Sequence, residues 1–192
     1  MNIVNVGYDS TNYYVLADSQ PRLLIDVGWP GTLPRLRYHC QRTGIDLGAV
    51  GHLLVTHFHP DHGGLVQELK QLGMNFILME SQLTAVSALK HYMKPEHHYV
   101  DVELHDNVIL TFDESRHFLE GIGIQGQIIP TRGHSEDSIS LILDSGEAFT
   151  GDLLHPMMLN EDTPISQQSW DLLRECGARQ IYPGHGPIWA LT

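Results

Sequence analysis

The amino-acid sequence predicts an α/β protein in which helices pack on the outside of stacked sheets. Short apolar segments with strand-like patterning recur along the chain, and segments with apolar residues at helical spacing lie between them. The 192 residues are 42% hydrophobic, which is ordinary for a globular protein. Because no long linker, charge block or internal repeat divides the chain, we expect residues 1–192 to form a single domain.

The first part of the chain predicts strands where short apolar or alternating runs end at Gly, Pro or polar residues. These strands are expected at Asn2–Val6, Asn12–Ala17, Arg22–Asp26, His52–Thr56 and Asn75–Met79. A helix is expected over Leu33–Arg42, ended by Gly44. A second helix is expected to run from the loop after Thr56 to about Gly73, since apolar residues follow Gly64 at helical spacing.

The second part begins with the least regular segment of the chain. Apolar spacing predicts a helix over Ser81–Met93 that Pro95 stops, and a short helix over Asp113–Leu119. We expect the segment from about residue 80 to about residue 120 to form a variable wall or lid over a substrate pocket. Further strands are expected at Gly126–Thr131, Ser138–Leu143, Glu147–Thr150 and Gln180–Tyr182. Ser166 is expected to cap a last helix that Gly177 ends.

Composition and charge exclude several classes of protein. The net charge of -12 argues against a nucleic-acid-binding surface, which would present a basic face. No stretch approaches the roughly 20 apolar residues of a membrane span. The start of the chain lacks the features of a secretory signal, and Cys40 and Cys176 form no CxxC pattern. We therefore expect reduced, buried thiols and a cytoplasmic protein.

One run, THFHPDHGG, concentrates residues that bind metals: His57, His59, Asp61 and His62. In extended chain His57 and His59 point to the same side, and Pro60 then ends the strand. Asp61 is expected as the N-cap of a helix. The following glycines let the backbone approach a metal closely. Imidazole and carboxylate are the ligands that hold zinc or a similar first-row metal in a site able to activate water.

Three more candidate ligands each follow a strand-like run. GQIIPTRG leads to His134, EAFTG to Asp152 and QIYPG to His185. Strands that end at one edge of a sheet place their following loops on a common rim. Together with the first run this makes seven ligands, too many for one tetrahedral ion, so we expect two metal ions. Zinc is expected, although these nitrogen and oxygen ligands also suit iron or manganese.

These motifs resemble those of the metallo-β-lactamase superfamily in their order along the chain. They are HFHPDH (57–62), GHS (133–135), TGD (150–152) and PGHG (183–186), with LIDVG (24–28) before them. The resemblance implies a four-layer αββα sandwich with two metals at the sheet edges. It implies that His57, His59 and His134 bind one metal and that Asp61, His62 and His185 bind the other. Asp152 would bridge the two.

Within that superfamily the ligand pattern is most similar to glyoxalase II-like and lactonase-like hydrolases. The chain continues for only seven residues after His185, which leaves no room for the C-terminal domain of glyoxalase II. The expected function is therefore hydrolysis of a small carboxylic ester, thioester or lactone by a metal-bridging hydroxide. Asp61 and Asp152 are the expected catalytic residues, with Asp61 shuttling a proton. The substrate is expected to be a small molecule, anionic ones included, since the metals would make the pocket positive.

Several alternatives stay open at this point. The same scaffold suits a phosphodiester hydrolase, or an iron-dependent oxidoreductase of the persulfide dioxygenase type. Asp26 either orients a ligand loop by hydrogen bonding or caps the turn before Gly28. His155 and Tyr182 lie near ligands in the sequence and either line the pocket or pack as ordinary side chains. The oligomeric state is not predicted.

Overall fold

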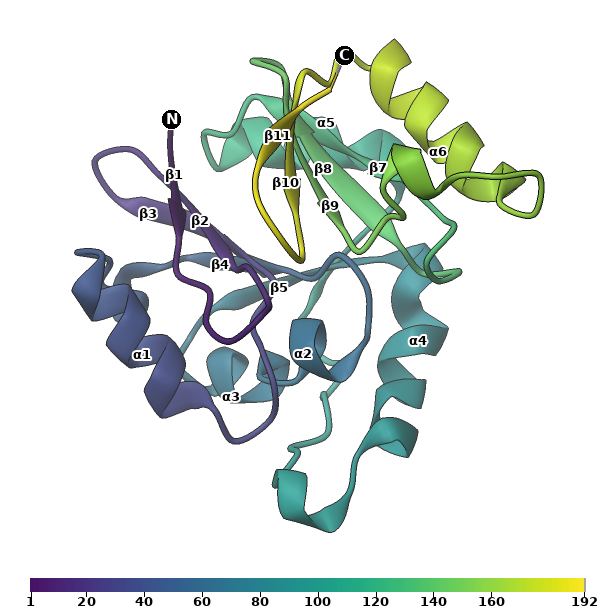
Figure 1. Ribbon diagram of the computed structural model, residues 1–192. Helices are drawn as coiled ribbons and strands as arrows, with labels where there is room; N and C mark the ends of the chain where they lie inside the picture. Colours follow the sequence, from purple (N-terminus) through teal and green to yellow (C-terminus); the bar gives the residue numbers. More distant parts are fainter. Residues whose placement is uncertain (192) are drawn as a thin grey trace. The chain divides into compact units, whose positions relative to one another are not determined.

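The computed structural model describes residues 1–191, shown in Figure 1. Within that range the chain divides into two compact units. The first is Met1–Leu110, and the second begins at Thr111. Each unit holds one sheet with helices, which confirms the predicted α/β class. That residues 1–192 form one domain stays a prediction.

The sheet of the first unit is antiparallel at one end and parallel at the other. Its strands, in spatial and chain order over the described residues, are β1 (Asn2–Asn5), β2 (Tyr14–Ala17), β3 (Pro21–Ile25), β4 (His52–Leu54), β5 (Asn75–Met79) and β6 (Val108–Leu110). β1, β2 and β3 pair antiparallel, whereas β3 to β6 pair parallel. Parallel neighbours need crossover connections, so the helices of this unit lie between those strands in the sequence.

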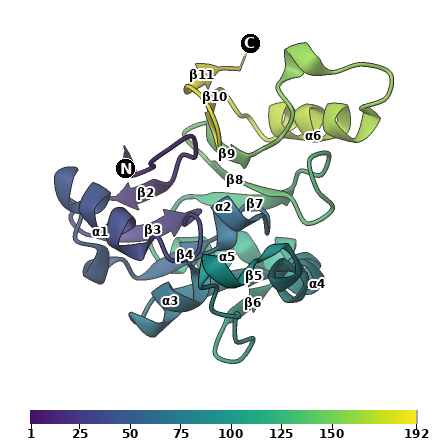
Figure 2. The same ribbon diagram turned by 60° about the horizontal axis from the view of Figure 1, so that its bottom comes forward.

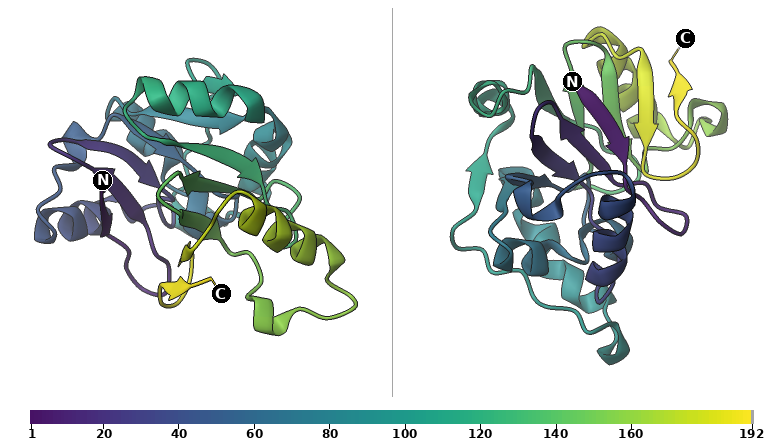
Figure 3. Two further views of the ribbon diagram at one scale, coloured as in Figure 1. Left: turned by 90° about the horizontal axis from the view of Figure 1, so that it is seen from above. Right: turned by 90° about the vertical axis from the view of Figure 1, so that its left-hand side faces the viewer.

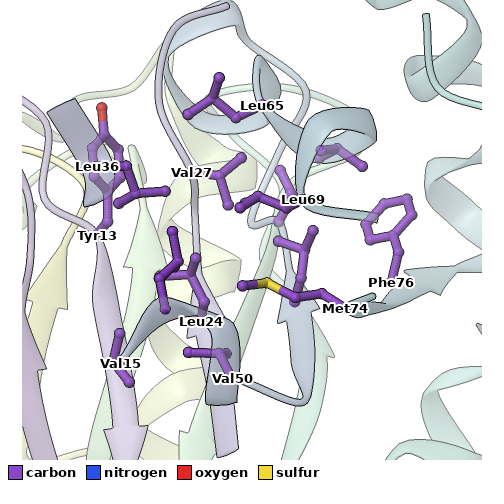
Figure 4. Packing of buried hydrophobic residues seen from close by; sticks show 14 of the residues in the cluster. Tyr13, Val15, Leu24, Val27, Leu36, Val50, Leu65, Leu69, Met74 and Phe76 are labelled. Carbon is purple, nitrogen blue, oxygen red and sulfur yellow. The ribbon is translucent and has the colours of Figure 1, made fainter. Parts of the chain in front are cut away.

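The crossover helices cover one face of this sheet (Figures 1 and 2). They are α1 (Leu33–Arg42), α2 (Pro60–Gly63), α3 (Val66–Gln71) and α4 (Leu83–Ala88). Figure 4 shows Leu36 of α1 and Leu69 of α3 packed against Leu24 and Phe76 of the strands, all fully buried. Burying such side chains contributes about 1.5–3 kcal/mol each. This packing fixes the ends of β3 and β4, from which the candidate ligand loop starts.

The second unit is built on a sheet with the order β11-β10-β9-β8-β7. Its strands, in the part of the chain that the structure describes, are β7 (Gly126–Pro130), β8 (Ile139–Leu143), β9 (Glu147–Gly151), β10 (Gln180–Pro183) and β11 (Trp189–Ala190). Helix α5 (Phe112–Gly121) lies beside β7 (Figure 3), where the Ser115 hydroxyl accepts from the Ile128 amide at 3.1 Å. Helix α6 (Pro164–Glu175) packs Trp170 and Leu173 into the core of this sheet.

Two predicted helices are wrong in their extent. The helix expected to run to Gly73 breaks after Gly63 and resumes at Val66. Gly64 approaches Gly28 so closely that a Cβ would lie 2.5 Å from the Gly28 carbonyl oxygen, and two glycines also weaken a helix. The helix expected over Ser81–Met93 is α4 flanked by the 3-10 turns η2 (Glu80–Gln82) and η3 (Leu89–Tyr92).

Two predicted N-caps are also wrong, for one reason. Proline is favoured at the first position of a helix, where its missing N–H is not needed. Helix α2 therefore begins at Pro60 and places Asp61 in its first turn, and helix α6 begins at Pro164 with Thr163 before it. Ser166 lies inside α6.

The described residues also include three short 3-10 turns, and none of the seven candidate metal ligands lies in these turns. They are η1 (Leu47–Ala49), η4 (Pro95–His97) and η5 (Pro156–Met158).

Over residues 1–191, no helix has the length and apolar character needed to cross a membrane. The expected cytoplasmic location stays a prediction.

Candidate metal centre

The loop between β4 and α2 brings histidine rings together within the first unit. The His57 and His59 ring centroids are 4.6 Å apart, and those of His57 and His62 are 4.2 Å apart. His57 and His62 are fully buried. The side-chain ligand atoms of His57 and His59, of His57 and His62, and of Asp61 and His62 lie within 4.8 Å of each other. The four candidates of this run thus form one cluster, as their spacing predicts.

Asp26, which directly follows β3, forms hydrogen bonds with residues of this loop and of α2. Its backbone has a left-handed φ of 60°, which Asp tolerates better than most residues. Its carboxylate accepts from the Thr56 amide at 2.7 Å, from the Thr56 hydroxyl at 2.9 Å and from His62 Nδ1 at 2.9 Å. The interpretation of Asp26 as the residue that orients the ligand loop is confirmed.

These hydrogen bonds also set which imidazole nitrogen can bind a metal. With Nδ1 of His62 donating to Asp26, Nε2 of His62 keeps its lone pair. The Thr56 hydroxyl donates to Asp26 and lies 3.2 Å from Nδ1 of His57, which can donate to it and leave Nε2 as the ligand atom. In these tautomers both rings can present Nε2 to a metal ion.

Asp61 is positioned by a residue that is distant in the sequence. The hydroxyl of Thr11, in the loop between β1 and β2, donates to Asp61 Oδ2 at 3.0 Å, and Thr11 is buried. The same Oδ2 lies 3.5 Å from His62 Nε2. A carboxylate oxygen and an imidazole lone pair repel each other at this distance unless a cation or proton lies near both, so the pair fits a metal ion.

Behind Thr11 lie two buried tyrosines. The Tyr8 and Tyr13 rings meet edge to face at 5.1 Å, and the Tyr8 hydroxyl hydrogen-bonds Thr32 at 2.6 Å. Burial raises the pKa of both phenols above their ordinary value of 10.0, so both hydroxyls are less acidic than those of exposed tyrosines. Gly28 makes room for them, because a Cβ there would lie 2.5 Å from the Tyr8 oxygen.

The second unit gathers the other three candidates at one edge of its sheet. β9 and β10 are parallel, with Gly151 opposite Pro183, so Asp152 and His185 follow at the same edge. β7 is antiparallel to β8, and β8 to β9, so His134 after β7 reaches that edge too. Asp152 Oδ2 lies 3.7 Å from His134 Nε2 and 3.4 Å from His185 Nε2. This arrangement is again the one expected of ligands that share a cation.

The loop before His134 depends on a glycine. Gly133 has a φ of 134°, which favours glycine, and a Cβ there would lie 2.2 Å from the Ser166 hydroxyl oxygen of α6. The Ser169 hydroxyl of α6 donates to the Arg132 carbonyl at 2.6 Å. Helix α6 therefore fixes the loop that carries His134.

The two interpretations left open for His155 and Tyr182, pocket lining and ordinary packing, have different outcomes. His155 lines a cavity beside His134, Asp152 and His185, whereas the Tyr182 ring packs at 5.0 Å from that of Phe149. Sequence reasoning missed Thr11, because no local pattern connects it with a carboxylate 50 positions later. The imidazole and carboxylate set fits zinc, iron or manganese. That the seven residues form one centre stays a prediction.

A family model described as the metallo-beta-lactamase superfamily matches residues 6–185 of this chain. Among curated proteins, a beta-lactamase-like protein 2 homolog of Caenorhabditis elegans is 24% identical over 93% of this chain and 56% of its own length. The lactamase-like protein nscB of Aspergillus fumigatus is 30% identical, over 93% and 48%. An atrochrysone carboxyl ACP thioesterase of Aspergillus terreus is 29% identical, over 94% and 50%. The chain thus spans about half the length of the curated relatives it matches.

Solved structures share the fold. The metallo-beta-lactamase family protein TTHA1429 from Thermus thermophilus has a TM-score of 0.74 at 22% identity, covering 98% of this chain and 74% of that one. TTHA1623 in a di-iron-bound form has a TM-score of 0.72 at 22% identity, covering 99% and 94%.

Proposed function

Because this chain belongs to the metallo-beta-lactamase superfamily, we propose that it is a metal-dependent hydrolase. Its substrate would be a small carboxylic ester, thioester or lactone. The observation that supports this most is the convergence of His134 and His185 on one oxygen of Asp152, at 3.7 and 3.4 Å. Two imidazole nitrogens grouped around a carboxylate oxygen in this way suit a cation. We also propose that, within the superfamily, the chain is most similar to glyoxalase II-like and lactonase-like hydrolases.

The proposal includes two metal ions, with zinc as the first choice. By the family pattern one ion would be held by His57, His59 and His134. The other would be held by Asp61, His62 and His185, with Asp152 shared. The hydrogen bonds from Nδ1 of His62 to Asp26 and from Thr11 to Asp61 support Asp61 and His62 as ligands, because they restrain both side chains and leave Nε2 of His62 for a metal ion.

The metal ions would act as Lewis acids toward a carbonyl oxygen. They would also lower the pKa of water, so that hydroxide is available at neutral pH to attack the carbonyl carbon. The chain's own residues would orient the reactants and move the proton. Asp61, held by the Thr11 hydroxyl, would accept the proton from the attacking water. Asp26 and Thr56 would keep His62 and His57 in one orientation throughout.

Thioesters are the first substrates to try within this class. The Aspergillus terreus relative is named as a thioesterase, and it matches 94% of this chain. A polymeric nucleic-acid substrate is not proposed, since the net charge is -12. The proposed partner is a small molecule.

The test is Asp152→Ala, measured by metal content and by turnover of a panel of thioesters, esters and lactones. Asp144→Ala is the control, because Asp144 is exposed and paired with Arg116. We expect Asp152→Ala to lose metal and to slow turnover by roughly a hundredfold or more, since even loss of an outer-shell partner costs about 10–100-fold. Unchanged metal content and unchanged rates would contradict the proposal. One iron with oxygen uptake would favour the persulfide dioxygenase type instead.

A further inference from the structure

A cavity of about 400 Å³ lies within the second unit, beside its three candidate ligands. Its size falls in the range of about 300–1,000 Å³ that is typical of small-molecule sites. His134, Asp152 and His185 form one part of the lining. The rest comes from the end of β9 and the segment after it, from Trp170 of α6, from β10 and from the segment between β10 and Trp189 of β11.

Most of the remaining wall is apolar. Leu153 and Leu154 follow directly after Asp152, and Trp170 and Trp189 have ring centroids 5.5 Å apart. The Trp170 Nε1–H donates to the Leu154 carbonyl at 2.8 Å, so the only polar atom of that ring is already bonded. Trp170 is 1% exposed and packs against the half-buried ring of Trp189, which offers carbon surface to a ligand.

His155 adds one polar atom to this wall. Its ring lies 4.6 Å from that of Trp189, and its Nδ1 accepts from the Met157 amide at 3.2 Å. With Nδ1 accepting, the proton of the neutral ring is on Nε2, which makes that atom a donor. A neutral oxygen of a ligand can use it.

The lining has no cationic side chain of its own. Among the described residues that surround the cavity there is no Lys or Arg. A carboxylate placed against the apolar part of the wall, away from His134, Asp152 and His185, would lose its water without gaining an ion pair, which is strongly unfavourable. The apolar part of the wall therefore favours an uncharged, apolar group of a ligand over a charged one.

We propose that this cavity binds a neutral, apolar and preferably aromatic acyl group of the substrate. The scissile carbonyl would lie at the edge formed by His134, Asp152 and His185. This inference rests on the proposed function for its place in catalysis, and it narrows the substrate from any small acyl compound to an aromatic one. The expectation that anionic substrates are included stays a prediction and concerns the part of a ligand near the candidate metal ligands.

Turnover tests the preference with thioesters that share one leaving group and differ in the acyl group. The acyl groups are acetyl, benzoyl, 2-naphthoyl and 6-carboxy-2-naphthoyl, with rates divided by those for alkaline hydrolysis. We expect kcat/KM to rise at least about tenfold from acetyl to 2-naphthoyl, and the added carboxylate to remove that gain. A flat series, or a preference for the carboxylate, would overturn the inference.

Variants then assign the preference to the cavity. Trp189→Ala should lower the ratio of 2-naphthoyl to acetyl turnover by about tenfold, whereas Trp189→Phe should keep most of it. Tyr38→Ala is the matched control, because Tyr38 is an exposed aromatic side chain of α1 that does not line the cavity. A ratio that Trp189→Ala leaves unchanged would contradict the assignment.

Binding of 2-acetylnaphthalene separates this inference from the proposed function, because that neutral ketone needs no hydrolysis. Titration calorimetry on the full chain should show binding that Trp189→Ala weakens about tenfold. Binding without turnover of any thioester, ester or lactone would contradict the hydrolase proposal and leave the cavity assignment standing. Turnover of a thioester without binding of 2-acetylnaphthalene would contradict the cavity assignment and leave the hydrolase proposal standing.

Discussion

The buried carboxylate of Asp26 accepts a hydrogen bond from Nδ1 of His62 at 2.9 Å. The same carboxylate accepts from the amide and hydroxyl of Thr56, which precedes His57. One side chain at the end of β3 therefore orients two candidate ligands on the loop after β4. Its left-handed backbone carries a cost of roughly 1–2 kcal/mol, which these hydrogen bonds offset.

Asp26→Asn should weaken metal binding without removing a ligand. The amide has nearly the shape of the carboxylate but lacks its charge, so it holds the Nδ1–H of His62 less strongly. We expect the metal affinity to fall by about 10–100-fold, measured by competition with a chromogenic chelator. Asp18→Asn, a change in an exposed ion pair with Arg22, is the control and should leave the affinity unchanged. Equal affinities for Asp26→Asn and the wild type would contradict the role given to Asp26.

Thr11→Val should impair Asp61 while keeping the shape of the side chain. Valine cannot donate to Asp61 Oδ2, and it leaves that oxygen free to rotate away from its place. We expect kcat to fall by about tenfold. Thr11→Ser keeps the hydroxyl and should retain most of the activity. If Ser and Val reduce kcat equally, the hydroxyl has no role and only packing matters.

Gly133→Ala should destabilise the fold and disturb His134. The added Cβ would meet the Ser166 oxygen at 2.2 Å in addition to the strain of a φ of 134°. Gly73→Ala separates the two effects, because Gly73 has a φ of 97° and no atom within 4 Å of an added Cβ. Chemical denaturation should show a loss of about 1 kcal/mol for Gly73→Ala and a clearly larger loss for Gly133→Ala. Equal losses would show that the contact with Ser166 relaxes freely.

The stability of the protein should fall at alkaline pH because of Cys40. Burial raises the pKa of this thiol to about 11 from an ordinary value of 9.0. The native state therefore holds the proton more tightly than the unfolded chain does. The contribution is fully present below pH 9 and is lost as the pH rises toward 11, with a size on the order of 2 kcal/mol.

Cys40→Ala gives the comparison for that pH dependence. Its free energy of unfolding, measured by urea titration between pH 8 and about 11, should fall less than that of the wild type, even if its stability at pH 8 is lower. The buried phenols of Tyr8 and Tyr13 contribute to the decline of both proteins. Parallel declines for the variant and the wild type would mean that other groups cause the effect.

The sequence predicted most of the strands and the grouping of candidate ligands within each unit, because each rests on a local pattern. That these residues bind metal stays a prediction. The runs expected at His52–Thr56, Gly126–Thr131 and Glu147–Thr150 contain or overlap β4, β7 and β9, and candidate ligands follow each of them. Spacing in HFHPDH was enough to bring the His57 and His59 rings together.

Other features depend on contacts that no local pattern records. β6 and β11 have three and two residues, too short for a periodicity to show. The break at Gly64 follows from a close approach to Gly28, and the role of Thr11 follows from a fold that returns it to Asp61. The apolar cavity is likewise formed by side chains from separate elements, such as Trp170 and Trp189.

The most direct test of the account is the metal stoichiometry of the full chain. The protein would be purified without chelators, supplied with zinc, freed of excess metal and measured by inductively coupled plasma mass spectrometry. We expect about two metal ions per chain, each held by imidazole and carboxylate ligands. A protein that carries no transition metal and takes up none would contradict the account.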